Sequence, residues 1–285
     1  MPKLYVVATP IGNLSDASER MVQTLASCGF IAAEDTRVTA NLLRHFNLRV
    51  PLVSCHRHSE AQKSSGIIAR MLEEDVDAAV VTDAGTPCIS DPGHLLVREA
   101  IEAGIEVLPV PGPTAMASAV SISGFDAKEF SFYGFLPREH ADLQKKLLEI
   151  GRGTPVAVLH ESPHRVVELM ETVCETLPNC RACVCCDLTK LYEKTLHGTA
   201  EEVLQALRDN PKTEKGEYCI VLDLSEVPHE EETQEKVSLE ARLAGYLMEG
   251  LSAREAVERL SDSGVKSNEA KRAMLNVRKW LEELE

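Results

Sequence analysis

The sequence predicts an α/β protein made of two α/β domains and a small helical tail. In the first half of the chain, short apolar runs typical of buried strands alternate with segments of helical periodicity. This alternation is the pattern of a parallel sheet covered on both faces. A proline-rich break follows, and apolar strand patterns then resume. After a run of glutamates, the last part of the chain carries helical patterns alone.

The first half supplies four expected strands and two clear helical faces. We expect the strands at residues 4–8, 30–33, 78–81 and 106–110, and the helical faces at 21–28 and around 67–72. Residues 109–113, Pro-Val-Pro-Gly-Pro, should be extended, because proline fixes its own φ and restricts the residue before it. We therefore expect a strap here between two domains, residues 1–112 and 113–225.

The second half continues with strands and then becomes acidic. Further strands are expected at residues 130–133, 156–159, 182–185 and 218–222. Residues 225–234 hold four glutamates and no Lys or Arg, which is typical of a solvated segment. The expected linker covers residues 226–236.

The tail, residues 237–285, is expected to form three short helices at 239–248, 252–260 and 268–284. Ser252 and Glu255 have the spacing of a capping box, and Gly264 follows the second helix. Three helices at this spacing resemble a helix-turn-helix module. A small bundle that only packs or dimerises fits the same spacing, so both interpretations stay open.

The formal net charge of −15 argues against a protein that binds any nucleic acid, since such proteins have a basic surface. The charge is uneven, however. Residues 1–58 hold six Lys/Arg and four Asp/Glu, which gives a net charge of +2. Residues 229–285 hold nine Lys/Arg and thirteen Asp/Glu, which gives a net charge of −4. The acidity therefore lies mainly in the middle of the chain. Recognition of one site on an assembled ribonucleoprotein remains compatible with it.

Cysteine usage and hydropathy predict a cytoplasmic protein. No apolar run approaches the roughly 20 residues that span a bilayer, and the first residues leave no room for a signal-peptide core. Nine cysteines, an odd number in a chain this long, suggest reduced thiols. Cys180, Cys183, Cys185 and Cys186 include a CxxC spacing but lack a second pair, so we expect buried strand thiols and no metal site.

Two motifs follow the first two expected strands. In residues 8–16, Ala-Thr-Pro-Ile-Gly-Asn-Leu-Ser-Asp, Gly12 allows a ligand to approach the backbone, although a plain strand-to-helix turn fits as well. In residues 33–37, Ala-Glu-Asp-Thr-Arg, Asp35 or Thr36 can cap a helix, and the acids also lie where open α/β sheets bind ligands.

The most specific motif is residues 82–93, Thr-Asp-Ala-Gly-Thr-Pro-Cys-Ile-Ser-Asp-Pro-Gly, directly after a buried strand. Its glycines and prolines restrict the backbone more than a connecting loop needs, which favours ligand binding. Ser90 or Asp91 is expected to cap a helix that begins near Pro92.

Polar residues also follow strands of the second half. Glu161 and Arg165 lie in residues 159–165, Leu-His-Glu-Ser-Pro-His-Arg, and Lys190 ends the segment Asp-Leu-Thr-Lys. They could face the same cleft from the second domain, or they could be surface caps and ion pairs.

These motifs together resemble a known family. ATPIGNLSD, AAEDTR, VTDAGTPCISDPG, PVPGPTA, GFLPR, ESPHR, LTK and KGEY occur in this order. The chain resembles, from about residue 4 to 222, the ribosomal small-subunit RNA 2′-O-methyltransferases that modify a decoding-centre cytidine, a family of the tetrapyrrole methylase superfamily. The tail resembles that family's helix-turn-helix extension.

The resemblance implies two α/β domains with S-adenosylmethionine in the cleft between them, a homodimer, and small-subunit rRNA, within the assembled 30S subunit, as the partner. It implies that Pro10, Gly12 and Asn13 lie by the cleft. It implies cofactor contacts for Asp83, Ala84, Gly85, Thr86, Pro87, Ile89, Asp91, Thr114 and Ala115. Two positions depart from the family pattern: Cys186 and Asp187 stand where Arg-Glu is usual, and His160 replaces an aromatic residue.

A ribose hydroxyl is a poor nucleophile at neutral pH and needs a base or a stabilising cation. Candidates for proton acceptance are Asp35, Asp83 and Glu161. Candidates for charge stabilisation or RNA contact are Arg37, Arg165 and Lys190. Two alternatives remain: a tetrapyrrole methylase, which predicts a wide apolar cleft and no tail, and a non-catalytic RNA-binding ribosome-assembly factor.

Overall fold

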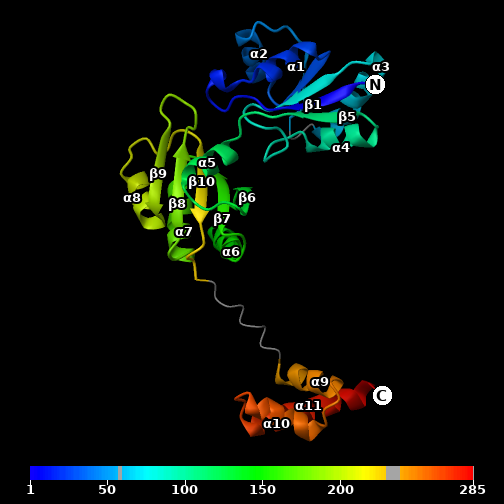
Figure 1. Cartoon of the computed structure of the whole chain (residues 1–285), viewed down its shortest axis with the longest axis vertical. Coiled ribbons are helices and arrows are strands. Elements are labelled where there is room, and N and C mark those ends of the chain that lie inside the picture. The colour runs from blue at the N-terminus through cyan, green and yellow to red at the C-terminus, as the bar shows by residue number, and fades with distance from the viewer. Residues whose placement is uncertain (57–59, 229–237, 285) are drawn as a thin grey trace. The chain divides into compact units, whose positions relative to one another are not determined.

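The computed structural model describes residues 1–56, 60–228 and 238–284, and it divides into two units at Pro228 (Figure 1). Most of the predicted linker, from residue 229 to 236, lies outside the described residues. Residues 226–228 belong to the first unit, where Val227 is buried. No helix of the described part is long and apolar enough to cross a bilayer.

The first unit begins with a five-stranded sheet whose strands are all parallel, as predicted. Its strand order is β3-β2-β4-β1-β5. The strands are β1 Lys3–Val7, β2 Phe30–Ala33, β3 Leu52–Ser54, β4 Ala78–Val81 and β5 Glu106–Val110. Every residue of β2 and β4 is buried, as expected for the central strands of a sheet covered on both faces. The short strand β3 was not predicted.

Helices cover both faces of this sheet. One face packs against α3 Glu60–Glu74 and α4 His94–Glu102 through a core that includes Ile67 and Leu96. The other face packs against α1 Glu19–Ser27 and α2 Thr36–His45 through Leu25 and Leu43. Asp35 caps α2, because its carboxylate accepts a hydrogen bond from the Arg37 backbone N–H at 2.8 Å. Asp35 was one of the two predicted caps, and Thr36, the other, is the first residue of the helix.

The second sheet is mixed, with strand order β6-β7-β10-β8-β9. Its strands are β6 Phe130–Phe135, β7 Val156–Glu161, β8 Arg181–Cys186, β9 Lys194–Thr199 and β10 Tyr218–Asp223. Strands β6 and β7 run parallel, and the remaining pairs are antiparallel. Strand β9 was not predicted from the sequence.

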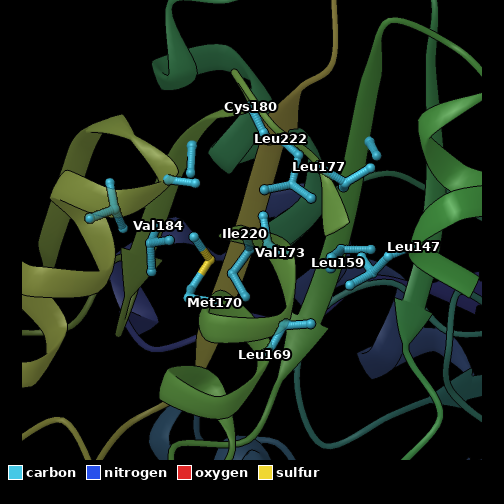
Figure 2. Close-up of a cluster of buried hydrophobic side chains, with 14 of the residues drawn as sticks. Leu147, Leu159, Leu169, Met170, Val173, Leu177, Cys180, Val184, Ile220 and Leu222 are labelled. Carbon is cyan, nitrogen blue, oxygen red and sulfur yellow. The ribbon is translucent and has the colours of Figure 1, made fainter. Parts of the chain in front are cut away.

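One face of the second sheet packs against three helices and the other against a single helix. The three are α6 His140–Gly151, α7 Val166–Thr176 and α8 Ala200–Arg208, and Figure 2 shows Leu147, Leu169 and Ile220 in the core beneath them. On the other face, α5 Ala115–Ser123 covers Cys183 and Cys185. The prediction of buried strand thiols is confirmed for these two residues.

The tail unit, described by itself, has three helices around its own core. They are α9 Leu239–Met248, α10 Ala253–Asp262 and α11 Ser267–Leu284, and the core includes Leu243, Leu260 and Val277. The predicted capping box of Ser252 and Glu255 opens α10. Such a three-helix core fits a helix-turn-helix module and a plain bundle equally well.

The start of α4 differs from the prediction that Ser90 or Asp91 caps it. The helix begins at His94, after Gly93. The carboxylate of Glu60, on α3, accepts hydrogen bonds from the backbone N–H groups of Gly93, Leu95 and Leu96 at 3.0, 2.7 and 3.3 Å. A side chain 33 residues away in sequence therefore replaces the local cap. No local spacing rule could have found it.

Replacement of Glu60 is expected to destabilise the first unit. Its side chain is 1% exposed, so Glu60→Ala leaves buried donors of α4 without an acceptor. The free energy of unfolding should fall by about 1–3 kcal/mol, measured by urea denaturation of the full chain. Glu60→Gln keeps one acceptor oxygen and should lose less. Equal stability of Glu60→Ala and the wild type would contradict this role.

Candidate functional site

Two predicted loops meet at the carboxyl ends of β1 and β4. The backbone of Thr9 pairs with that of Gly85: the Thr9 N–H donates to the Gly85 carbonyl at 2.9 Å, and the Gly85 N–H donates back at 3.0 Å. Gly85 has φ +80°, a conformation that side chains disfavour. A Cβ there would lie 3.4 Å from Ile11 Cγ2, which is ordinary contact. The glycine is therefore required by its backbone angle and not by lack of space.

A cavity of about 390 Å³ opens beside this pair of loops. Eight of the predicted site residues line it: Ala84, Gly85, Thr86, Ile89, Asp91, Thr114, Ala115 and Glu161. Sequence reasoning had not assigned the other lining residues to the site: Ile11, Ser90, Met116, Phe135, His160, Ser162, Pro163, Leu188, Gly216, Glu217, Tyr218 and Cys219. Most of them lie in or beside quoted motifs, and residues 216–218 belong to KGEY, which is the signal that could have found them.

Pro10 and Asp83 line a separate, smaller cavity of about 220 Å³. Its other lining residues are Thr9, Leu14, Val38, Thr39, Asn41, Leu42 and Thr82. The larger cavity and this one share no lining residue. The remaining predicted site residues line neither of the two: Gly12, Asn13, Asp35, Arg37, Pro87, Arg165 and Lys190.

Gly12 packs closely against the Asp-Leu-Thr-Lys segment. A Cβ on Gly12 would lie 2.5 Å from Cγ of Lys190 and 3.1 Å from the carbonyl oxygen of Leu188. The absence of a side chain at Gly12 thus allows residues 188–190 to pack against the backbone. The sequence had suggested that a ligand would approach there. Asn13 has a local role, since its side chain accepts the Ser15 N–H at 3.0 Å and caps a short 3-10 helix, Leu14–Asp16.

Asp35, Arg37 and Asp83 form one cluster, in which the pKa values of the two carboxyl groups shift in opposite directions. Arg37 Nη2 lies 2.6 Å from Asp35 Oδ2, and this hydrogen bond, with backbone donors, lowers the pKa of Asp35 to about 2. Burial raises the pKa of Asp83, against the hydrogen bond that it accepts from the Asp35 N–H at 3.1 Å. Asp35 is therefore the weaker base of the two, and the guanidinium of Arg37 is anchored but 88% exposed.

Glu161 ends β7 and brings a buried carboxylate to the larger cavity. Its Oε1 accepts the Ser162 N–H at 2.7 Å. Its Oε2 lies 3.3 Å from Nη1 of Arg165, yet accepts no well-aligned hydrogen bond within the described part of the chain. Arg165 is itself fixed, because its Nη2 donates to the Pro137 carbonyl at 2.9 Å. One buried carboxylate oxygen thus keeps free lone pairs beside the cavity.

Lys190 is held as a cation. Its Nζ donates to Asp187 Oδ1 at 2.7 Å and to Glu217 Oε2 at 2.9 Å. Burial lowers the pKa of Lys190, but the two carboxylates raise it more, and the net shift is upward. Lys190 is therefore protonated at neutral pH and serves as a fixed positive charge, not as a proton acceptor.

The two departures from the family pattern have structural explanations. His160 contacts Phe132 and Phe135, with ring centroids 5.1 and 5.8 Å apart, and so occupies an aromatic position. Burial lowers the pKa of His160, which keeps the ring neutral at neutral pH. Burial raises the pKa of Cys186, so this thiol brings no charge where the family has an arginine.

No group of three or more His, Cys, Asp or Glu suited to a metal ion occurs among the described residues. Cys183 and Cys185 lie with their sulfurs 3.8 Å apart, under α5. The lining of the larger cavity is typical of an organic-ligand site, with apolar walls, backbone groups and the acidic residues Asp91, Glu161 and Glu217.

Comparison with known proteins agrees with this architecture. The model of the tetrapyrrole (corrin/porphyrin) methylases matches residues 3–204. Among solved structures, the methyltransferase CobJ aligns with a TM-score of 0.58 and 16% identity over 78% of this chain and 94% of its own. Uroporphyrin-III C-methyltransferase from Thermus thermophilus, in complex with S-adenosylhomocysteine, aligns with a TM-score of 0.55 and 15% identity over 78% and 97%. At these identities the likeness shows the fold alone.

Curated relatives are much more similar. Ribosomal RNA small subunit methyltransferase I of Halalkalibacterium halodurans is 39% identical over 265 residues, 92% of this chain and 91% of the relative. The protein of the same name from Bacillus subtilis is 36% identical over 90% of this chain and 88% of its own length. The chain therefore belongs to the tetrapyrrole (corrin/porphyrin) methylase family and, within it, to the ribosomal RNA small subunit methyltransferases I.

Proposed function

We propose that this chain transfers a methyl group from S-adenosylmethionine to the ribose 2′-oxygen of a decoding-centre cytidine in small-subunit rRNA. One observation carries the proposal: in a chain 39% identical to an rRNA methyltransferase, the motifs after β4 and β7 enclose a cavity of about 390 Å³. Cavities of this size accept a cofactor-sized molecule.

The lining of the larger cavity suits S-adenosylmethionine. Ile11, Ile89 and Leu188 supply apolar walls, and Gly85 offers backbone without a side chain. Glu161 supplies a carboxylate oxygen, Oε2, that accepts no well-aligned hydrogen bond within residues 1–56 and 60–228. This anion suits a cavity that binds a cationic molecule. The bound cofactor supplies a methyl group on a positively charged sulfur.

In the reaction, a bond forms from the ribose 2′-oxygen to the methyl carbon while the carbon–sulfur bond breaks and its electron pair stays on sulfur. The hydroxyl proton must pass to a base. We assign this role to Glu161, because it is the predicted proton acceptor that lines the larger cavity. Arg165, 3.3 Å away, holds that carboxylate in place and is a positioning residue.

The cations divide into fixed and available groups. Lys190 is occupied by Asp187 and Glu217, and Arg165 by Glu161 and a backbone carbonyl. Arg37 is anchored by Asp35 at one edge and 88% exposed, so we assign it the contact with an RNA phosphate. Lys190 then stabilises the packing of its segment against Gly12.

The substrate is proposed to be the assembled small subunit, because a net charge of −15 disfavours indiscriminate binding to naked RNA. The homodimer, the cytoplasmic location and the domain boundary near residue 112 remain predictions.

A tetrapyrrole methylase is disfavoured as the alternative, because the curated relatives at 36–39% identity are named for rRNA.

The function is tested with labelled S-adenosylmethionine and purified small subunits, with naked rRNA as a separate substrate. We expect label on one cytidine 2′-oxygen of the assembled subunit, located by primer-extension mapping. Glu161→Gln should lower kcat by about 100-fold or more at saturating cofactor. Calorimetry should also show weaker cofactor binding, because the variant removes the anion from the cavity that binds the cationic cofactor.

Glu168→Gln, on the exposed side of α7, is the matched control and should keep wild-type activity. Absence of label from both RNA substrates would refute the proposed function. Full activity of Glu161→Gln would refute only its role as base.

Gly85→Val should lose cofactor affinity by about tenfold or more, because a β-branched residue at φ +80° strains the loop and breaks its pairing with Thr9. Calorimetry measures the dissociation constant. Gly104→Val is the matched control, since Gly104 has φ +74°, a Cβ there would meet no neighbouring atom within 4 Å, and the position is far from the loops in sequence. Equal affinity losses in both variants would show a general effect on stability.

Arg37→Ala should weaken binding to the small subunit more than binding to the cofactor. Loss of one phosphate contact reduces the slope of log affinity against log salt by about one. Filter binding across a salt series measures it. Arg98→Ala, another exposed arginine paired with an acid, should leave the slope unchanged. A wild-type slope in Arg37→Ala would exclude the proposed contact.

A further inference from the structure

The smaller cavity, lined by Asp83, Asn41 and Val38 among others, lies at the carboxyl ends of β1 and β4, and α2 forms another wall. Its volume of about 220 Å³ is below the range of pockets that hold drug-sized molecules. It suits a single ring better than a whole cofactor.

The backbone pair of Thr9 and Gly85 separates the smaller cavity from the larger one. Thr9 lines the smaller cavity, Gly85 lines the larger one, and their two backbone hydrogen bonds join the loops between them. Asp83 and Ala84 are consecutive in sequence but line different cavities. A ligand held in the smaller cavity therefore lies next to the site proposed for the methyl donor.

The walls combine apolar surfaces with two groups of opposite hydrogen-bonding character. Pro10 and Leu42 are apolar, and Leu14 and Val38 are unusually exposed for large apolar side chains, at 41% each. Apolar walls of this kind accept the flat faces of an aromatic ring.

The polar groups supply an acceptor and a donor. Asp83 offers a carboxylate, one oxygen of which already accepts the Asp35 N–H. Asn41 Oδ1 accepts from Arg44 Nη1 at 2.8 Å, which fixes the amide so that its NH₂ group is the part left to donate. Asp83 and Asn41 both line the cavity.

We propose that the smaller cavity binds the base of the target cytidine, extruded from the RNA, and that Asp83 reads its exocyclic amino group. This inference rests on the proposed function. An aspartate is the side chain that accepts from cytosine N4, and the Asn41 amide can donate to the ring acceptors of the same base. Enzymes that act on a base commonly hold that base outside the stack in such a pocket, and the proposal extends this arrangement to an enzyme that modifies the ribose.

The assignment explains the choice of cytidine over uridine. Uracil presents an oxygen where cytosine presents an amino group, so it would place one acceptor against the Asp83 carboxylate. Arg37, anchored by Asp35 next to Asp83, then lies where the phosphate of the same nucleotide would be bound. In the proposed complex, the base thus lies at Asp83, the phosphate at Arg37 and the methyl donor in the larger cavity beside Gly85.

The first test measures base discrimination. Small subunits are assembled with cytidine or uridine at the mapped target position, and kcat/KM is measured for each. Wild type should prefer cytidine by about tenfold or more. Asp83→Asn replaces an acceptor by a group that also donates, and should reduce this preference at least tenfold, with cofactor affinity unchanged in calorimetry.

Asp35→Asn is the matched control. It removes the neighbouring carboxylate, which does not line the cavity, and should lower activity on both substrates through Arg37 while the cytidine-to-uridine ratio stays as in the wild type. A wild-type ratio in Asp83→Asn would overturn the inference.

The second test fills the cavity. Val38→Trp places a large ring at an exposed lining position, and should abolish methylation while thermal unfolding and cofactor affinity are retained. His45→Trp, on the same helix but outside the lining, should remain active. Full activity of Val38→Trp would overturn the inference.

The two proposals fail in different ways. If the wild type methylates neither substrate, the proposed function fails and the inference fails with it. If the wild type is active and the variants behave like it, only the base pocket is refuted.

Discussion

The backbone pairing of Thr9 with Gly85 is the interaction on which the site depends. Two hydrogen bonds of 2.9 and 3.0 Å join the loop after β1 to the loop after β4. They place Ile11 and Ala84 on the larger cavity, and Pro10 and Asp83 on the smaller one. Because the pairing uses main-chain groups, its geometry depends on the left-handed angle of Gly85 more than on any side chain.

Close packing around this pair joins it to the second sheet. Gly12 meets Lys190 at a distance that leaves no space for a Cβ, and Ile11 packs in the core formed by α5 and the second sheet. Lys190 is tied in turn to Asp187 and Glu217, and Glu217 lines the larger cavity. The cavity is therefore walled by the loops that follow β1 and β4 and by residues of the second sheet, and its shape follows from contacts between segments far apart in the sequence.

The sequence predicted the elements that its local pattern determines. Strands β2 and β4 are continuous apolar runs, and Asp35 and Ser252 cap helices at the expected spacing. Strands β3 and β9 were missed because the first is only three residues long and the second, Lys194–Thr199, is largely polar. The cap of α4 by Glu60 was missed because it depends on tertiary packing, whereas Glu217 was missed although the KGEY motif that holds it had been noted.

Two carboxylates that the sequence treats alike differ because of their surroundings. Asp35 and Asp83 were both candidates for proton acceptance, and both lie two residues after a strand of the first sheet, β2 and β4 respectively. Arg37 lowers the pKa of Asp35 to about 2, whereas burial raises that of Asp83. A carboxylate held by a guanidinium orients a cation, while one beside a small cavity can accept a hydrogen bond from a ligand. In the proposed reaction, Asp35 therefore orients Arg37 toward a phosphate, Asp83 reads the base, and Glu161 at the larger cavity accepts the proton.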